Sequence, residues 1–471
     1  MNAVRNVQGL GVEARSIDYV PAAERHGKVI DHGKFWFLSN FQFYSIALGF
    51  IGPSMQLSFA FTVLAAVLGV LSGTLFTAFH ASQGPELGLP QMIQSRAQFG
   101  YRGVIIPLFG SLFTFVGFNV VDTILISQGL HGVFGWNELA LCVVLAIGGA
   151  AIAIYGYDWL HLVFRLLFWL SLPLYLVLSI AIGDGGIQPR TLTHAGFEWV
   201  AFAAQFTASF AYNITYAPCV SDYTRYLPKA ARPASLVANV YGGASISALW
   251  LIVIGAWMGS YLGESDALVG LAVGGNEVFA HFGTILALVS AVALAATMGM
   301  NAYSAMLTVL TSIDSFVPIR PTRQVRVVTI LAIMTIWFGI AIALNSSGLT
   351  ALYASLSLAL YLLLPWTAVN LMDYFFVRRG QYRIQDLFCA TGIYGAWGWR
   401  GISAYGVGFL TSIPFFVLSG YYEGPLARAI GGVDISWVPG LLVSALSYYA
   451  LTRSLDLVRE SAAVRSDAIS A

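Results

Sequence analysis

Long apolar stretches separated by short polar segments recur along almost the whole chain. Each is near or above the roughly 20 residues that an α-helix needs to cross the hydrocarbon core of a bilayer. The pattern predicts an all-α polytopic membrane protein with about twelve transmembrane helices. We place them at about 35–54, 58–80, 104–131, 138–156, 162–183, 198–219, 235–262, 280–311, 327–345, 348–376, 402–421 and 433–451. Pro365 lies inside the tenth stretch, where we expect a kink or a break.

Basic residues are distributed unevenly over the predicted loops. Twelve crossings put both termini on one side, and 21 of the 23 lysines and arginines lie on that side. Only Arg190 and Arg428 lie on the other. Because basic loops stay in the cytoplasm, we predict cytoplasmic termini and a location in the inner or plasma membrane.

Composition supports the same class. Of the 471 residues, 58% are hydrophobic and 10% are charged, with a mean hydropathy of +0.75. A soluble protein carries roughly a quarter charged residues. The net charge of +1 gives no indication of nucleic-acid binding, and three scattered cysteines predict neither a disulfide framework nor a metal site. Residues 1–33 are polar, so we expect no signal peptide there. We also expect a monomer embedded in the lipid bilayer, without a cofactor.

The third span contains the one acid that we expect deep in the membrane. Phe118 and Asp122 are four residues apart and therefore share a helical face. A ring and a carboxylate one turn apart could stack on a planar heterocycle and accept its N–H donors. Asp122 could instead bind a cation, carry a proton, or serve as a structural acid paired with a buried amide or hydroxyl.

The first and sixth spans carry further candidates. In the first, Gln42 shares a face with Leu38 and Phe41 and could contact a ligand or form an interhelical hydrogen bond. In the sixth, Pro218 removes a backbone donor, which predicts a broken helix whose free backbone groups can bind substrates or ions. The candidate side chains near that break are Phe210, Tyr212 and Asn213.

The eighth span has a polar stripe at three- and four-residue spacing, which could line a cavity or join helices. The stripe consists of Thr297, Asn301, Ser304 and Thr308. Together the four spans offer aromatic faces, amides, hydroxyls and one acid. They contain no nucleophile–base pair typical of an enzyme and no ring of charges typical of an ion filter. Such a site suits a small, planar, mostly neutral ligand with several hydrogen-bonding edges.

The chain resembles the nucleobase–cation symporter family, the purine–cytosine permease group. The resemblance is carried in order by "ERHGK" (24–28), "GLPQMIQSRAQFGYRG" (88–103), "SDYTRYLP" (221–228), "NAYSAML" (301–307), and "MDYFFVRRGQYRIQDLF" with "GIYGAW" (372–397). It covers nearly the whole chain, and the last stretch is the most specific.

This resemblance implies two inverted repeats of five helices, at about 34–183 and 198–379, which form a transporter core over 34–379. A linker and two additional helices follow over 380–451. Residues 1–33 and 452–471 would be cytoplasmic tails. It also implies alternating access around a central site in spans one, three, six, eight and ten.

The resemblance further assigns roles to individual residues. Substrate contacts are expected from Phe41, Gln42, Phe118, Asp122, Ser209, Phe210, Asn213 and Asn301. A sodium ion would be held by the carbonyls of Leu38, Phe41 and Ala293 together with two adjacent hydroxyls, where this chain has Ala296 and Thr297. One hydroxyl is therefore missing, which weakens the sodium site. Proton coupling is used elsewhere in the family, and Asp122 is the candidate carrier.

The prediction is a symporter that imports a nucleobase of cytosine or purine type, or a related planar heterocycle, driven by protons or sodium. The alternative is an importer of another ring, such as hydantoin or a vitamin precursor. A channel would need a continuous polar pore, and a membrane enzyme would need a catalytic pair. No catalytic residue and no bound metal are expected.

Overall fold

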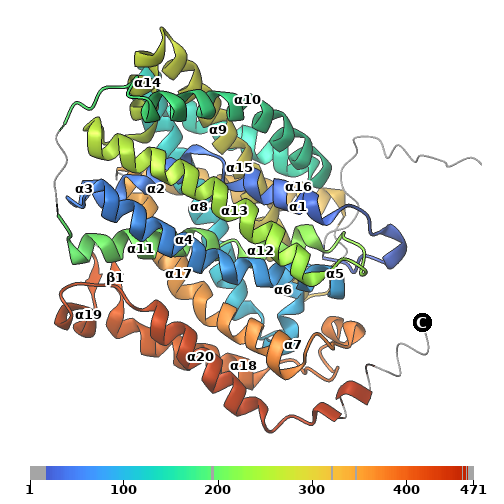
Figure 1. Cartoon of the computed structure of the whole chain (residues 1–471). Coiled ribbons are helices and arrows are strands. Elements are labelled where there is room, and N and C mark those ends of the chain that lie inside the picture. The colour runs from blue at the N-terminus through green and yellow to red at the C-terminus, as the bar shows by residue number, and fades with distance from the viewer. Residues whose placement is uncertain are drawn as a thin grey trace, which may run out of the picture.

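The computed structural model of the chain describes residues 17–191, 196–319, 322–344, 347–418, 420–458, 460–462 and 464. The predicted tails, 1–33 and 452–471, lie partly outside these residues. The described chain is a bundle of helices with one small antiparallel hairpin, β1 (Val417–Leu418) and β2 (Tyr422–Glu423) (Figure 1). The predicted all-α class is confirmed.

Eight helices among the described residues are long and apolar enough to cross a membrane. A helix satisfies its own backbone hydrogen bonds, which is why long apolar segments take this form in lipid. They are formed from α4 (Phe59–Ala81), α8 (Ile105–Phe134), α9 (Glu138–Tyr155), α10 (Tyr157–Gly183), α13 (Pro233–Tyr261), α15 (Phe282–Asp314), α16 (Arg323–Ala343) and α17 (Gly348–Met372). Each overlaps one of the predicted spans. A π-helical turn, Asp373–Val377, follows α17.

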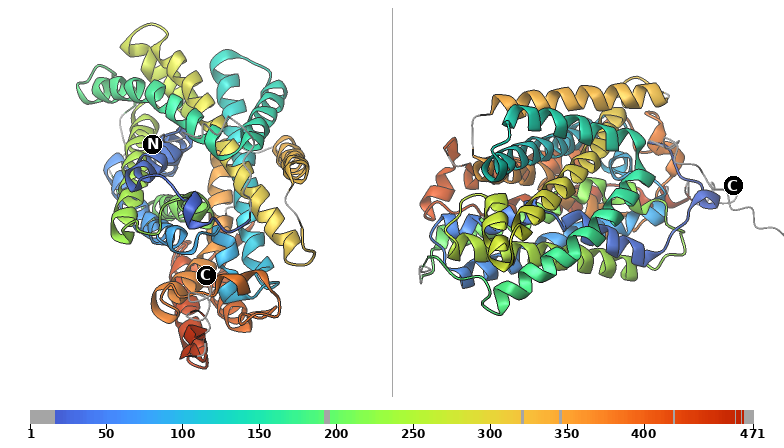
Figure 2. Two further views of the ribbon diagram at one scale, coloured as in Figure 1. Left: turned by 90° about the vertical axis from the view of Figure 1, so that its right-hand side faces the viewer. Right: turned by 90° about the horizontal axis from the view of Figure 1, so that it is seen from above.

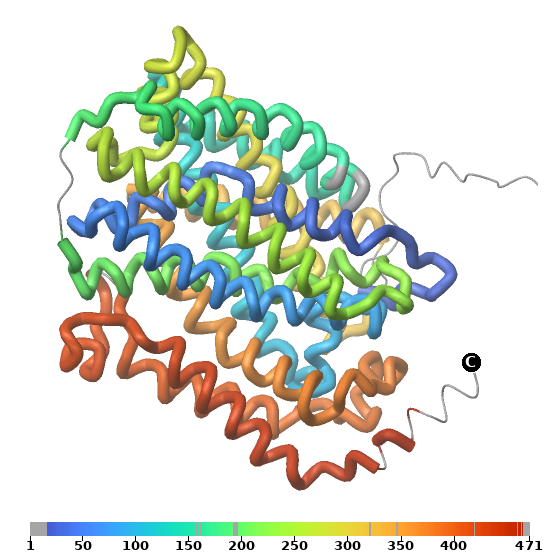
Figure 3. Tube along the Cα trace, viewed as in Figure 1, coloured from blue at the N-terminus to red at the C-terminus, as the bar shows by residue number. Residues whose placement is uncertain are grey.

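Two predicted spans are broken helices. The first span consists of α1 (Val29–Asn40), α2 (Phe43–Gly49) and α3 (Ile51–Ser54), and the sixth of α11 (Trp199–Ile214) and α12 (Ala217–Thr224). Figure 3 traces the chain through both breaks. They fall in the first helix of each predicted repeat, although the division into repeats remains a prediction.

The last two predicted spans form shorter helices, α18 (Trp399–Ser412) and α20 (Trp437–Thr452). They pack against each other and against α17, on one flank of the bundle (Figure 1). The span predicted at 402–421 ends earlier: α18 stops at Ser412 and a short 3-10 helix, Ile413–Phe415, follows it, because Pro414 has no N–H to continue the α-helical hydrogen bonds. The hairpin and the short helix α19 (Pro425–Ala429) follow instead. The total of twelve crossings therefore stays a prediction.

Further short helices in the connections were not predicted either. α5 (Gln83–Leu87), α6 (Gln91–Gln94) and α7 (Arg96–Phe99) lie between the second and third spans. α14 (Ala267–Val278) precedes α15 and packs against α15 and α8. These segments are short or rich in glycine, so their apolar pattern is weaker than that of a membrane span.

The broken helices lie against long ones. α1 and α2 pack against α13, α11 packs against α4, and α15 packs against α8, while α16 lies at the periphery (Figure 2). Small residues permit the closest approach: a Cβ atom on Gly255 of α13 would lie 1.9 Å from the Ile46 carbonyl oxygen of α2. This packing holds both breaks inside the bundle.

Candidate functional site

The first span is interrupted at Phe41, whose backbone (φ −86°, ψ 62°) is not helical. α1 ends at Asn40, and α2 begins one residue after Gln42. The carboxamide oxygen of Gln42 accepts a hydrogen bond from the Tyr44 N–H (2.7 Å), which satisfies a free donor at the start of α2. The side chain of Gln42 therefore stabilises the break in the first span.

The second break separates α11 from α12. Pro218 stands at the start of α12 and has no N–H to continue the hydrogen-bond pattern. Asn213, near the end of α11, joins the two breaks. Its side chain accepts a hydrogen bond from Asn40 (2.6 Å) and donates one to the Thr74 hydroxyl of α4 (2.6 Å). The two broken helices are thereby fixed to each other.

Four aromatic rings meet beside the breaks, and we call them the aromatic cluster: Tyr44, Phe118, Tyr212 and Tyr216. Tyr44 and Tyr212 stack with centroids 5.3 Å apart and an interplanar angle of 14°. Phe118 meets Tyr44 edge-on at 5.7 Å and lies 5.9 Å from Tyr216. All four are buried. The cluster offers flat apolar faces contributed by α2, α8 and the sixth span.

An acid and an amide lie next to this cluster. Asp122 of α8 is 1% exposed and Asn301 of α15 is 2% exposed. The Asn301 amide nitrogen donates to one Asp122 carboxylate oxygen over a long 3.5 Å. Asp122 stands one turn after Phe118 on α8, and Phe118 is a member of the aromatic cluster. The acid therefore faces the aromatic cluster.

Several buried polar atoms here lack a protein partner. Among the described residues, the Oδ1 atoms of Asp122 and Asn301 and the hydroxyl of Tyr44 form no hydrogen bond. A buried polar group without a partner costs about 1–3 kcal/mol, so such groups are rare in folded proteins. Their concentration beside the aromatic cluster is typical of a site whose partner is a ligand.

Two predicted residues of the sixth span point elsewhere. The ring of Phe210 packs against Phe76, Phe206 and Trp437. Ser209 accepts a hydrogen bond from Gln205 (3.0 Å). Residues two apart in an α-helix point in directions that differ by roughly 200°. Phe210 and Tyr212 therefore cannot share a face. We expected Phe210 to face the ligand, and the structure brings tyrosines to the aromatic cluster in its place.

Gln42 and Asn213 make their hydrogen bonds within the protein. The Gln42 amide nitrogen donates to the Tyr212 hydroxyl (2.9 Å), and Ser45 donates to the same hydroxyl (3.0 Å). In this arrangement both amides position the aromatic cluster and the helix breaks. Of the eight predicted substrate contacts, Phe118, Asp122 and Asn301 are those that the structure brings together around unpartnered atoms.

The sequence reasoning missed Tyr44 and Tyr216. Tyr216 stands one turn after Tyr212 and directly before the helix restarts, and this spacing was the available signal. Tyr44 follows the break at Phe41, and its direction depends on the backbone conformation of the break. The direction of the Tyr44 side chain therefore cannot be predicted from the periodicity of the sequence.

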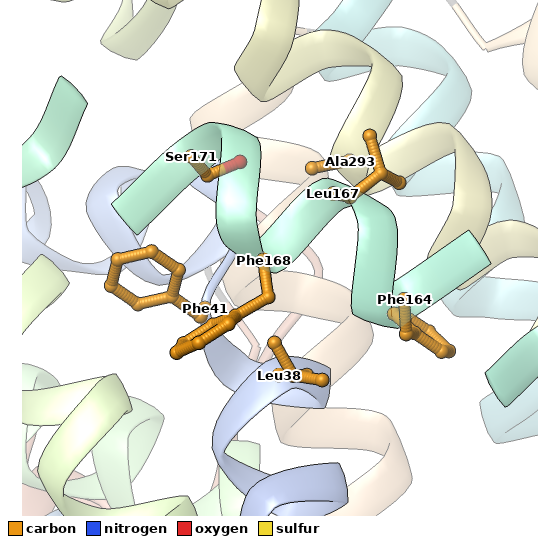
Figure 4. A pocket seen from close by; sticks show the side chains of 7 residues that line it. All are labelled: Leu38, Phe41, Phe164, Leu167, Phe168, Ser171 and Ala293. Carbon is orange, nitrogen blue, oxygen red and sulfur yellow. The ribbon is translucent and has the colours of Figure 1, made fainter. Parts of the chain in front are cut away.

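Three of the five predicted cation-site residues line a small cavity, namely Leu38, Phe41 and Ala293 (Figure 4). Ala296 and Thr297 are buried further along α15, and the Thr297 hydroxyl points back to the Ala293 carbonyl over 3.4 Å. Neither lines the cavity. Helix α10, which was not predicted to take part, contributes the remaining wall.

A membrane-embedded helical bundle with two broken helices meeting at a buried site defines a transporter, because broken helices at membrane depth occur where they line a cavity. Residues 19–440 match the family described as permeases for cytosine/purines, uracil, thiamine and allantoin. The chain belongs to this family, which is a family of transporters and not of enzymes.

Individual relatives support the assignment to this family. A Bacillus subtilis protein named as a candidate purine-cytosine permease, YxlA, is 33% identical over 446 residues, 94% of this chain and 96% of its own length. The purine-cytosine permease fcyB of Emericella nidulans is 25% identical over 468 residues, which cover 94% of this chain and 88% of that protein. These matches span nearly the full length of both proteins.

Solved structures establish the fold. The nucleobase-cation-symport-1 family transporter Mhp1, in a closed conformation with bromovinylhydantoin bound, superposes with a TM-score of 0.73 at 18% identity. The match covers 97% of this chain and all of that one. An inward-facing Mhp1 structure gives a TM-score of 0.69 at 19% identity, covering 97% of this chain and 98% of that one. The chain is therefore a multi-pass membrane protein with the Mhp1 fold.

Proposed function

We propose that the protein is a secondary active symporter that imports a nucleobase of cytosine or purine type, or a related planar heterocycle, by alternating access. Transport would be driven by a proton or sodium gradient across the inner or plasma membrane. The supporting observation is the buried aromatic cluster facing the unpartnered oxygens of Asp122 and Asn301. Family membership favours the same class of substrate.

The site matches such a ligand group by group. The faces of Phe118 and the neighbouring tyrosines suit a flat ring, because stacking does not depend on which heterocycle is present. The free oxygens of Asp122 and Asn301 accept N–H donors from the ring edge, and the Tyr44 hydroxyl can donate or accept. Asp122 holds these donors and, in a proton-coupled cycle, carries the proton.

Release to the cytoplasm requires that the inner side of the bundle opens. A chain of buried side-chain hydrogen bonds links the connecting helices to α17: Gln91 donates to Gln83 (2.8 Å), Gln83 to Asn370 (2.8 Å), and Asn370 to Gln98 (3.4 Å). In our proposal this amide chain closes the cytoplasmic side while the ligand is bound. It breaks when α17 moves away from α5, α6 and α7.

The test is a thermal-shift screen of the purified protein against a panel of nucleobases, hydantoin, allantoin and vitamin precursors, with sodium and pH varied. A ligand that binds the folded state raises its melting temperature. We expect stabilisation by an aminated nucleobase, and saturable counterflow of that compound, unchanged, in proteoliposomes. If only hydantoin, allantoin or a vitamin ring stabilised the protein, that compound would replace the nucleobase as the proposed substrate. No stabilisation by any planar heterocycle would refute the proposal.

A further inference from the structure

His80 lies in the last turn of α4, at the end of the helix that the predicted topology places toward the cytoplasm. Its side chain is fully buried. The Nδ1 atom lies 2.9 Å from the Phe76 carbonyl oxygen, and because a carbonyl oxygen only accepts, Nδ1 carries the proton and donates. In the neutral ring Nε2 is then an acceptor without a hydrogen. This atom has no hydrogen-bond partner among the described residues.

The ring of His80 is covered on one face by α17. It stacks on Trp366, with ring centroids 5.0 Å apart and an interplanar angle of 27°. The indole N–H of Trp366 donates in turn to the hydroxyl of Ser95, which stands between α6 and α7 (2.9 Å). Trp366 is also fully buried. The aromatic ring that covers His80 therefore belongs to the helix whose movement opens the cytoplasmic side in our proposal.

The end of α4 is bonded to α12 through its backbone. The Ser221 hydroxyl of α12 donates to the His80 carbonyl (3.1 Å), and the Thr224 hydroxyl donates to the Ala81 carbonyl (2.9 Å). The contact of His80 with α17, in contrast, is made by two stacked rings with no hydrogen bond between them. A movement of α17 can therefore uncover the imidazole while α4 and α12 stay together.

The charged groups near this end of α4 have other partners. They are Asp222 of α12, Arg225 after it, Glu86 of α5 and Asp373 after α17. Asp222 accepts from a backbone N–H of α6 (2.9 Å), and Arg225 donates to the Asp222 carbonyl (3.2 Å). Glu86 pairs with Lys229 (2.9 Å), and Asp373 pairs with a neighbouring arginine (2.6 Å). The cysteine and tyrosines of the same elements are uncharged near neutral pH.

A proton on Nε2 would therefore be unfavourable in the closed protein. It would create a buried charge with no acceptor and no carboxylate bonded to it among the described residues. Burying a charge without a partner is among the most costly changes in a protein interior. In water the same atom binds a proton readily, because an imidazole titrates close to neutral pH.

We propose that His80 is a proton-binding site on the cytoplasmic side of the transporter, empty while that side is closed and occupied when it is open. When α17 carries Trp366 away, water reaches Nε2 and the imidazole takes up a proton. The charged ring cannot return to the stack until it releases that proton. Low cytoplasmic pH therefore holds the inward-open state and slows the return step. This inference rests on the alternating access of the proposed function and adds a proton site distinct from Asp122.

The experiment measures opening at equilibrium, without a pH gradient. The buried thiol of Cys219 on α12 is labelled with a maleimide in purified protein whose Cys142 and Cys389 have been replaced by Ala and Ser. Each rate is divided by that of the unfolded protein at the same pH, which removes the pH dependence of the thiol itself. A group with a pKa near 6.5 that is protonated only in the open state raises the open population about tenfold between roughly pH 8 and pH 5.5. We expect the normalised rate to rise by about this factor.

Two variants remove the proposed site. His80→Gln and His80→Asn stay neutral at both pH values, so their normalised rates should change by less than about twofold. Retained binding of a heterocycle shows that these variants are folded. His131→Gln is the matched control, because His131 also donates from Nδ1 to a backbone carbonyl (2.8 Å) but is exposed. It should keep the native response, and Asp122→Asn should keep it too, which separates His80 from the proposed proton carrier.

Two results would overturn the proposal. One is a normalised rate in the native protein that is the same at both pH values. The other is an equal rise in the native protein and in a folded His80 variant. Either result, with a heterocycle still bound by the native protein, would leave the proposed substrate class intact. Failure of the native protein to bind any planar heterocycle would instead refute the proposed function.

Discussion

The amide nitrogen of Asn301 lies 3.5 Å from a carboxylate oxygen of Asp122, and the remaining side-chain oxygen of each residue has no partner within the described part of the chain. The two residues come from different helices, α15 and α8, that pack closely. A pair held at this distance and left half-bonded is suited to accept a ligand between or beside its members.

Replacing Asp122 with Asn should reduce uptake more than tenfold and remove its pH dependence. The amide has the same shape, but it replaces one accepting oxygen by a donor and cannot carry a proton. Initial uptake rates over a range of pH, in cells with matched expression, provide the measurement. Glu138→Gln, at the exposed start of α9, is the control and should behave like the native protein. Unchanged rate and pH profile in Asp122→Asn would rule out both roles of the acid.

Phe118→Ala should weaken ligand binding while Phe210→Ala should not. Removing an aromatic that stacks on a base costs about 1–3 kcal/mol, or roughly 5- to 150-fold in Kd. Phe210 is an equally buried ring of similar packing, but it contacts Phe76 and Trp437. Its loss should lower the melting temperature and leave Kd within about threefold. Isothermal titration of both purified variants distinguishes the two sites, and equal loss of affinity would contradict the assignment.

The sequence predicted the helices well, because lipid leaves a long apolar segment few alternatives to an α-helix. It also located the broken helix of the sixth span, since Pro218 has a fixed local consequence. The sequence predicted less about the directions in which individual side chains point. Whether Phe210 or Tyr216 faces α8 depends on helical phase and packing, which periodicity in an all-apolar helix does not specify.

The amide chain, which in our proposal closes the cytoplasmic side, offers a test of alternating access. Gln83 both accepts from Gln91 and donates to Asn370, so Gln83→Leu leaves a donor and an acceptor without partners. We expect the closed state to lose about 1 kcal/mol and the open population to rise about fivefold. The native thiol of Cys219 on α12, which is buried, reports this opening.

The measurement is the rate at which a maleimide labels Cys219 in protein whose exposed Cys389 has been changed to Ser. Cys142, which is buried on α9, is changed to Ala so that Cys219 is the thiol left to react. Gln324→Leu, on the exposed first turn of α16, is the control variant and should label at the native rate. A saturating heterocycle should slow labelling of the native protein. Equal labelling of Gln83→Leu and native protein would show that the amide chain does not close the site.

Arg378→Gln should destabilise the protein strongly, whereas Arg379→Gln should not. Arg378 donates to the fully buried carboxylate of Asp373 (2.6 Å) and is itself held by Glu460 (2.9 Å). Removing one member of a buried ion pair leaves the other charge without compensation, at a cost of about 3–5 kcal/mol. Asp373 keeps its bonds from Tyr382 (2.7 Å) and Tyr448 (2.9 Å), so the lower end of that range is expected. The neighbouring Arg379 is exposed, and its replacement should change stability by less than about 0.5 kcal/mol. Melting temperatures of the two purified variants provide the measurement, and a similar value for both would show that the buried contacts of Arg378 with Asp373 and Glu460 add no stability.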